Sequence, residues 1–254
     1  MTLPAALTYP SNLPSNLSSV QIMDLRPILP TNPKYTWETL KGLRNINDLT
    51  TIVFHHDALS KASTLGYDNR TLAMRIAQSH IKSTKNRADG DAGFPYHAWI
   101  RNGVIHITNN LEAFTYGVAS NNGYTVHICV SGDYANHDTL TDQDRNALYA
   151  AYFLFRQWLP KYQQLVGHKE LSPTSCPGFD MGKVRKDISA IELEMSLSNT
   201  PNAAMSRIFG FHTRYQDLYN KAVNPKDPNQ AAAQMKLMDI IQTAIDKGYY
   251  VPSA

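Results

Sequence analysis

Leu49-Thr50-Thr51-Ile52-Val53-Phe54 is an apolar, β-branched run that is followed directly by His55 and His56. A run of this composition, without a charged residue, is typical of a strand buried inside a sheet. Such a strand contributes to the core and presents two imidazoles at its carboxyl end. We therefore expect a sheet to organise the fold and His55 to lie at the end of one of its buried strands.

The segments that follow alternate between helical and strand periodicity. Thr141 and Asp144 resemble a capping box, and the apolar stripe that begins after them runs to Leu159, before Pro160 ends the pattern. The expected elements are a helix over 71–82, a β-hairpin over 96–107, a strand over 124–130 and this second helix. Alternating strands and helices predict an α/β domain in which helices flank a central sheet.

The two ends of the chain differ from this middle part. Residues 1–45 hold many prolines among Ser and Asn, which predicts an extended N-terminal arm. Residues 199–254 show two apolar stripes at helical spacing, which predicts a C-terminal helical appendage. Residues 46–190 are then the domain that carries the chemistry.

Composition narrows the classes of function. The 254 residues are 43% hydrophobic and 18% charged, as in an ordinary globular protein. A net charge of +3, without a basic run interleaved with aromatic residues, argues against nucleic acid as a partner. No apolar segment has the length that a bilayer requires, so membrane insertion is not expected. The first ten residues contain no basic residue and no long apolar stretch, so we expect no signal peptide and synthesis in the cytoplasm.

His168-Lys-Glu-Leu-Ser-Pro-Thr-Ser-Cys176 places an imidazole and a thiolate around a proline-containing turn. Together with His55 it offers two imidazoles and one thiolate, all of which are zinc ligands. Three protein ligands leave a fourth position open on the metal, which is typical of catalytic rather than structural zinc. The pattern therefore indicates a hydrolase that uses Zn²⁺. Each of these residues taken singly is more often structural, and Cys129, inside an apolar strand, is interpreted as a buried inert thiol.

Four stretches carry a family resemblance: Ile52-Val53-Phe54-His55-His56, Tyr96-His97-Ala98-Trp99-Ile100, Val130-Ser131-Gly132-Asp133-Tyr134 and Gly167-His168-Lys169-Glu170-Leu171-Ser172-Pro173-Thr174-Ser175-Cys176-Pro177-Gly178-Phe179-Asp180. They resemble the signature blocks of zinc-dependent N-acetylmuramoyl-L-alanine amidases of type 2. That family groups phage lysozyme-type amidases with the peptidoglycan recognition proteins. The resemblance covers about residues 46 to 190, and the last block is the most specific.

The resemblance implies a central mixed β-sheet flanked by helices and a complete site. It makes His55, His168 and Cys176 the zinc ligands, and it places Tyr96 and Thr174 beside the scissile amide. The substrate would be the peptidoglycan bond between N-acetylmuramic acid and L-alanine. A chain of this kind without a signal peptide resembles a phage endolysin, which is made in the bacterial host cytoplasm and acts at the cell wall.

Two positions depart from the family pattern. Some relatives have glutamate as a general base at the position of His127 and others have glycine, so this imidazole is a candidate for proton transfer to the leaving amine. The alternative is a strand histidine that faces solvent or packs under the site. At Gly117 relatives often carry a histidine that lines the substrate groove, and that contact is therefore in doubt. His56 is interpreted as a residue that supports the ligands.

Two other functions stay open at this point. A peptidoglycan-binding recognition module without catalysis is the first, although members of that kind typically lose the thiolate ligand, so Cys176 argues against it. A virion-associated or sporulation-linked wall protein with the same chemistry is the second. The C-terminal appendage could bind a wall polymer, pair two chains or cover the catalytic domain. Host, stem-peptide preference and oligomeric state are not indicated by the sequence.

Overall fold

The computed structural model describes residues 7–82, 88–198, 221, 226, 228–236 and 239. The chain divides into two compact units, residues 1–189 and residues 190–254. Of the predicted appendage at 199–254, the described part includes a helical stretch over residues 230–236. The remainder of that prediction lies outside the described residues.

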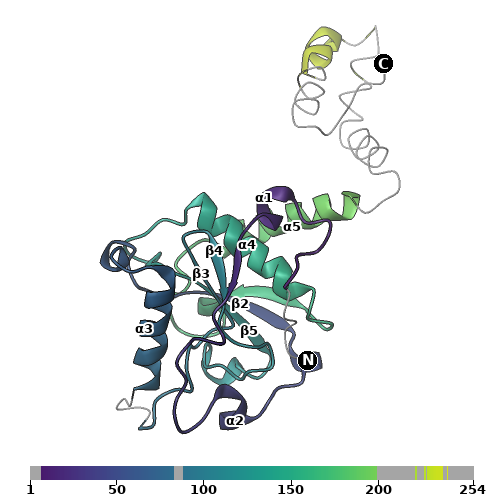
Figure 1. The fold of residues 1–254 in the computed structure, drawn as a ribbon. Coiled ribbons are helices and arrows are strands. Elements are labelled where there is room, and N and C mark those ends of the chain that lie inside the picture. Colours follow the sequence, from purple (N-terminus) through teal and green to yellow (C-terminus); the bar gives the residue numbers. More distant parts are fainter. Residues whose placement is uncertain are drawn as a thin grey trace. The chain divides into compact units, whose positions relative to one another are not determined.

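A six-stranded mixed sheet forms the centre of the first unit (Figure 1). Its strands are β1 (Ile22–Asp24), β2 (Thr51–His56), β3 (Ala98–Arg101), β4 (Val104–Ile107), β5 (Thr125–Val130) and β6 (Gln164–Gly167). Their order across the sheet is β1-β4-β3-β5-β2-β6. The β3–β4 pair is antiparallel, and every other neighbouring pair is parallel. The predicted α/β class with a central mixed sheet flanked by helices is confirmed.

Strand β2 lies inside this sheet, between β5 and β6, and all six of its residues are buried. This agrees with the interpretation of its sequence as a charge-free buried strand that ends in two histidines. The predicted hairpin is also present, as β3 and β4. Its turn residues Asn102 and Gly103 have φ values of 52° and 72°, the left-handed backbone that a tight two-residue turn requires.

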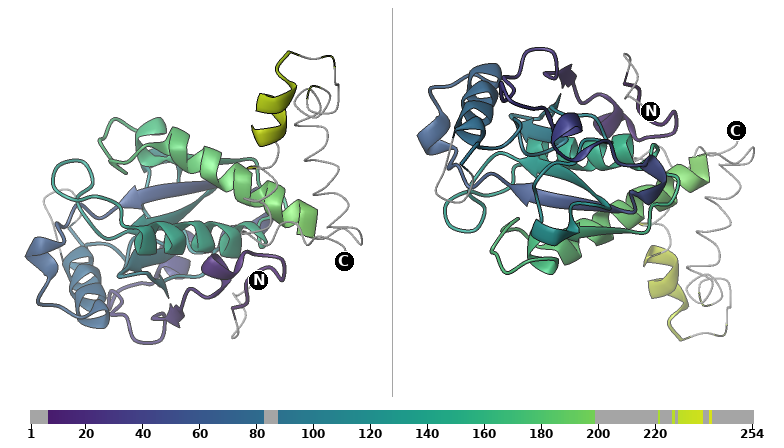
Figure 2. Two further views of the ribbon diagram at one scale, coloured as in Figure 1. Left: turned by 90° about the horizontal axis from the view of Figure 1, so that it is seen from above. Right: turned by 90° about the horizontal axis from the view of Figure 1, so that it is seen from below.

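Helices cover both faces of the sheet. Helix α3 (Asn69–Ile81) buries Leu72 and Ile76 in a cluster with Trp99 and Cys129, which identifies the face that it covers. Helix α4 (Asp142–Arg156) contacts β3, β4 and β5 from the other face (Figure 1). Helix α5 (Met181–Ser198) runs beside α4 (Figure 2), where the Tyr149 hydroxyl donates a hydrogen bond to the Asp187 carboxylate at 2.8 Å.

The short elements are the helices α1 (Ser15–Ser18) and α2 (Trp37–Lys41) and the 3-10 turns η1 (Ile46–Asp48), η2 (Ala62–Thr64), η3 (Ala119–Asn121) and η4 (His168–Glu170). Residues 7–45 are not only an extended arm over the domain. Strand β1 extends the sheet through its pairing with β4, and the Trp37 indole donates a hydrogen bond to the Phe94 carbonyl at 2.9 Å. Among the described residues, no helix combines the length and the apolar character that crossing a membrane requires.

Helix α4 differs from its prediction at both ends. Thr141 is the N-cap, and its hydroxyl accepts from the Asp144 amide at 3.2 Å. The reciprocal half of a capping box is not formed, because the Asp144 carboxylate instead binds the Lys61 ammonium and the Gly103 amide. The helix ends at Arg156 rather than Leu159. The proline that follows Leu159 disfavours helical backbone before it, so the last predicted turn opens.

Candidate metal centre

His55 is the penultimate residue of β2, and its side chain is 1% exposed. Strand β6 runs parallel to β2, with Gly167 paired to Phe54. His168 follows β6 directly, so it lies at the same carboxyl end of the strands as His55. The centroids of the two imidazole rings lie 4.8 Å apart. Parallel pairing of two strands thus brings together two histidines that are far apart in the sequence.

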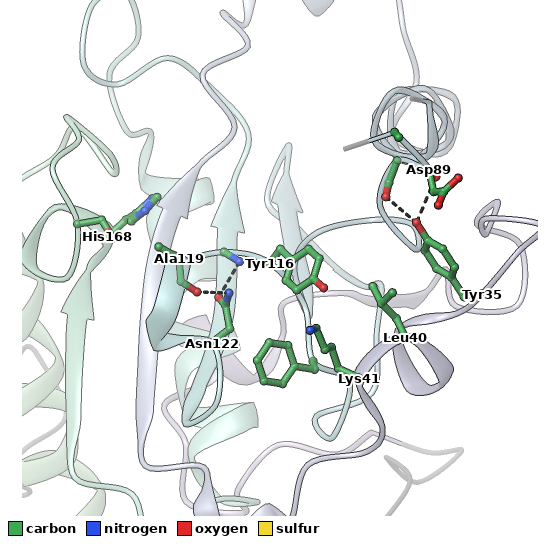
Figure 3. A pocket seen from close by; sticks show the side chains of 13 residues that line it. Tyr35, Leu40, Lys41, Asp89, Tyr116, Ala119, Asn122 and His168 are labelled. Carbon is green, nitrogen blue, oxygen red and sulfur yellow. Dashed lines mark hydrogen bonds between the residues drawn. The ribbon is translucent and has the colours of Figure 1, made fainter. Parts of the chain in front are cut away.

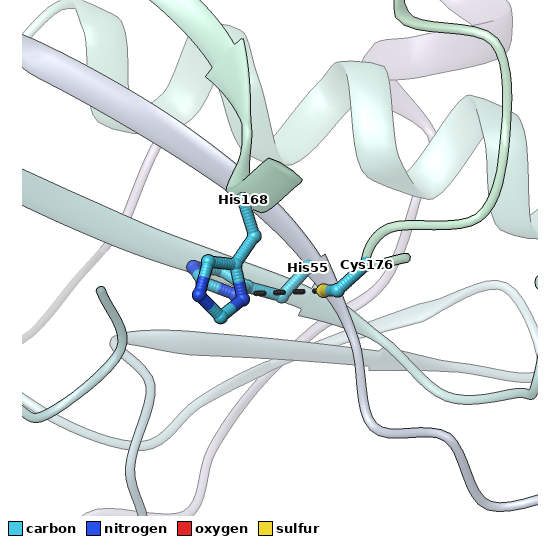
Figure 4. Close-up of side chains that lie close together, drawn as sticks. All are labelled: His55, His168 and Cys176. Atoms are coloured by element: carbon cyan, nitrogen blue, oxygen red, sulfur yellow. Dashed lines mark hydrogen bonds between the residues drawn. The ribbon is translucent and has the colours of Figure 1, made fainter. Parts of the chain in front are cut away.

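Cys176 reaches the same place because its turn folds back. The Lys169 amide donates to the Cys176 carbonyl at 2.7 Å, which closes the segment that starts at His168. The sulfur then accepts a hydrogen bond from the His56 amide at 3.3 Å. Figure 4 shows the three predicted ligand side chains turned toward one another.

This donor set fits zinc. The candidate ligand atoms of His55, His168 and Cys176 all lie within 4.8 Å of one another, and Nδ1 of His55 is 3.8 Å from the Cys176 sulfur. Bond lengths of about 2.0 and 2.3 Å in a tetrahedron require a nitrogen–sulfur separation of about 3.5 Å. Burial lowers the pKa values of both imidazoles, which favours the neutral form that binds metal. Burial also raises the pKa of the Cys176 thiol to about 11, so its thiolate requires a nearby cation.

His127 lies against His55 rather than toward solvent. Its Nδ1 is 3.1 Å from Nε2 of His55, and its Nε2 is 3.2 Å from the Thr125 hydroxyl. The side chain is fully buried. Both ring nitrogens are therefore engaged within the protein, and transfer of a proton to a leaving amine would require one of these two contacts to break.

Tyr96 also stands beside the first ligand. Its ring centroid is 5.0 Å from that of His55, and the side chain packs against the buried cluster that contains Trp99 and Cys129. Burial raises the pKa of the Tyr96 hydroxyl well above its ordinary value, so the group keeps its proton and remains a donor. The residue as a whole is half-buried.

Thr174 and His56 support the turn and the strand end. The Thr174 hydroxyl accepts from the Cys176 amide at 3.2 Å, and the side chain is otherwise exposed. The structure thus places Thr174 within the ligand turn and leaves its hydroxyl hydrogen available. Nδ1 of His56 accepts from the Tyr134 amide at 3.2 Å, and this imidazole therefore holds the neighbouring loop, as expected for a supporting residue.

A groove of about 770 Å³ runs from His168 toward α2 (Figure 3). Its walls include the aromatic side chains of Tyr35, Phe114 and Tyr116 and the ammonium group of Lys41. Gly117, the position at which relatives often carry a histidine, lies in the same wall. Of the three candidate ligands, His168 lines this groove.

Arg44 is a residue that the sequence did not reveal. It comes from the predicted extended arm, yet it is buried, and its guanidinium donates to the carbonyls of Leu111, Asn122 and Thr125. Burial lowers its pKa to about 10, so it remains charged at neutral pH. The Arg44 guanidinium therefore links the segments that carry these three carbonyls. A single arginine in a proline-rich segment shows no sequence pattern that predicts this role.

No protein-family model and no curated protein matches the chain. Solved structures that are similar to it include the endolysin and N-acetylmuramoyl-L-alanine amidase LysCS of Clostridium intestinale, with 23% identity and a TM-score of 0.48 over 66% of this chain and 95% of that chain. The endolysin of the Thermus scotoductus bacteriophage Ph2119 is 23% identical, with a TM-score of 0.49 over 65% of this chain and 97% of that chain. Drosophila peptidoglycan recognition protein LB is 18% identical, with a TM-score of 0.49 over 67% and 93%. Likeness at this level does not decide between catalysis and binding.

Proposed function

We propose that this protein is a zinc-dependent N-acetylmuramoyl-L-alanine amidase, which hydrolyses the amide bond between N-acetylmuramic acid and L-alanine in bacterial peptidoglycan. The observation that carries the proposal is the meeting of His55, His168 and Cys176 at ligand distance, at one end of a groove. Three such ligands leave a fourth position on zinc for water or substrate. A purely structural zinc site would normally use all four positions for protein ligands.

Zinc held by these side chains would lower the pKa of a bound water to about 7 and polarise the amide carbonyl. The side chains around it bind and orient the substrate. Tyr96 is a protonated donor beside His55, so its hydroxyl can stabilise the oxygen that becomes negative during attack on the amide. Thr174 offers a second hydroxyl from the ligand turn.

The groove suits a glycopeptide. Aromatic rings of Tyr35, Phe114 and Tyr116 offer flat apolar surface, while Lys41 offers a cation for the carboxylates of stem peptides. Because His168 forms part of the same wall, a muropeptide in the groove would have an amide within reach of the metal centre. Peptidoglycan is therefore the proposed substrate.

We further propose that the protein is a phage endolysin, present in the host cytoplasm before it reaches the wall. The competing function is a recognition module that binds peptidoglycan in the same groove without cutting it. A thiol at ligand distance from His55 favours the enzyme, because a module without catalysis has no need of a complete set of zinc ligands.

The deciding experiment uses the full chain loaded with zinc and incubated with purified peptidoglycan. We expect new L-alanine amino termini to accumulate, and we expect a chelator or His168→Ala to abolish them. His137→Ala, which changes an exposed histidine outside the site, is the matched control and should retain activity. Binding to peptidoglycan without any release of amino termini, at saturating zinc, would establish the recognition module instead.

A further inference from the structure

A continuous hydrogen-bonded chain lies beneath the metal centre, and the proposed hydrolysis does not use it. The Thr125 hydroxyl is 2.8 Å from the Asn121 carbonyl oxygen and 3.2 Å from Nε2 of His127. Nδ1 of His127 is 3.1 Å from Nε2 of His55. The side chains of Thr125, His127 and His55 are between 0% and 1% exposed, so water does not compete for these contacts.

The donor and the acceptor of each hydrogen bond in this series follow from the bond to the Asn121 carbonyl. A backbone carbonyl can only accept, so Thr125 gives its single hydroxyl hydrogen to Asn121. The Thr125 oxygen must then accept from His127, which places the His127 proton on Nε2. A neutral imidazole with its proton on Nε2 has a lone pair on Nδ1. That lone pair accepts from Nε2–H of His55.

Both imidazoles are neutral in this arrangement. A second proton on either ring would bury a charge, which is costly without a paired counter-charge. With its only proton on Nε2, His55 has a lone pair on Nδ1, the atom that faces the Cys176 sulfur at 3.8 Å. The opposite tautomer would point an N–H bond into the metal centre and could not bind a cation.

We propose that Thr125 and His127 are positioning residues that hold His55 in its Nε2–H tautomer, so that Nδ1 is ready to bind zinc before the metal arrives. The inference rests on the metal centre of the proposed function, but not on its substrate. It assigns His127 a role that does not involve proton transfer to the leaving amine.

The surroundings keep the His127 ring in the required orientation. Its backbone amide donates to Nδ1 of His97 at 3.0 Å, and the two rings are stacked with centroids 5.5 Å apart. The Gly117 backbone lies close to the ring, so that a Cβ added there would fall 2.6 Å from Nδ1 of His127. Asn121, which accepts from Thr125, is linked to the ligand turn through its side-chain amide, 3.3 Å from the Leu171 carbonyl. The series of hydrogen bonds from Asn121 to His55 is therefore held in place at both ends.

The tautomer can be read directly in the zinc-free protein. Proton–nitrogen correlation spectra of the full chain, labelled with ¹⁵N in the histidine rings, report which nitrogen of each imidazole carries hydrogen. We expect hydrogen on Nε2 and a free lone pair on Nδ1 for both His55 and His127. Hydrogen on Nδ1 of His55 would overturn the proposal, and this measurement requires no variant to fold.

Substitutions of Thr125 test this series of hydrogen bonds, with zinc affinity measured by competition with a chromophoric chelator. Thr125→Val keeps the branched shape but removes the acceptor, and we expect zinc affinity to fall by about 10- to 100-fold, the usual effect of losing a group that orients a ligand. Thr125→Ser restores the hydroxyl and should return the affinity to near that of the parent protein. Equal loss of zinc affinity in both variants, or no loss with Thr125→Val, would contradict the proposed positioning role. Because no substrate is present, the outcome is independent of whether the protein proves to be an amidase.

Discussion

A Cβ atom added to Gly117 would lie 2.6 Å from Nδ1 of His127, a distance that folded proteins do not tolerate between a Cβ and a ring atom. The imidazole thus fills the space that a side chain at residue 117 would need. These are the two positions at which the sequence departs from the amidase family it resembles. Their contact makes the departures a single feature, since a histidine at 127 requires glycine at 117.

This contact predicts that Gly117→Ala destabilises the protein. The methyl group must displace the His127 ring or the backbone of its own loop, and overpacking of this kind costs about 1 to 3 kcal/mol of unfolding free energy. Chemical denaturation of the parent and variant measures the loss. Gly123→Ala is the control, because a Cβ there meets no atom within 4 Å.

In a His127→Ala background the added methyl group has room. The cost of Gly117→Ala should then largely disappear, which is the non-additivity expected of residues in direct contact. If the two substitutions are additive, the contact is not what requires glycine at this position.

Short-range patterns in the sequence predicted much of the site. A charge-free strand ending in His55 and the turn from His168 to Cys176 are local features, and parallel pairing of β2 with β6 brings them together. The burial of Arg44 and the contact between Gly117 and His127 depend on how remote loops pack. Such contacts leave no periodic signal, so sequence patterns could not predict them.

Zinc binding should release the thiol proton of Cys176, in addition to a proton from water bound to the metal. Burial raises the pKa of this thiol to about 11, so it is protonated in the metal-free protein at pH 8, whereas burial keeps the His55 and His168 imidazoles neutral. Coordination requires the thiolate, so the proton must leave. Calorimetric titration with zinc in buffers of different ionisation enthalpy counts the protons. At pH 8 a zinc-bound water of pKa about 7 also loses its proton. We therefore expect about two protons for the parent protein and about one for Cys176→Ser, together with much weaker binding; an equal count in the two proteins would identify another source.

Tyr96→Phe should lower turnover without affecting the metal. The substitution keeps the ring beside His55 and removes only the hydroxyl, so zinc affinity should stay within about twofold of the parent value. Loss of one donor to the developing oxyanion typically costs about 100- to 1,000-fold in kcat. Release of L-alanine amino termini from a soluble muropeptide gives kcat and KM separately. Cys129→Ala, which changes a residue of the buried cluster that Tyr96 packs against, should retain most of the activity; equal loss in both variants would mean that Tyr96 acts through packing and not through its hydroxyl.

Acid should destabilise the fold in part through His106. This buried imidazole donates from Nδ1 to the Trp99 carbonyl at 3.1 Å, and burial lowers its pKa to about 4. Above pH 6.5 the group is neutral in both folded and unfolded chains. Between pH 6.5 and 4 His106 binds a proton in the unfolded chain but not in the folded chain. The free energy of unfolding therefore falls, by up to about 3 kcal/mol from this residue.

His106→Asn removes the titration while its amide nitrogen can still donate to Trp99. The variant should be less stable than the parent at pH 7.5, because the smaller side chain leaves a cavity. Its unfolding free energy should nevertheless fall less steeply as the pH drops from 6.5 to 4, so the two curves converge. Denaturant melts at half-unit pH steps measure both curves. Curves that stay parallel throughout this range would show that His106 already titrates near its ordinary pKa in the folded protein.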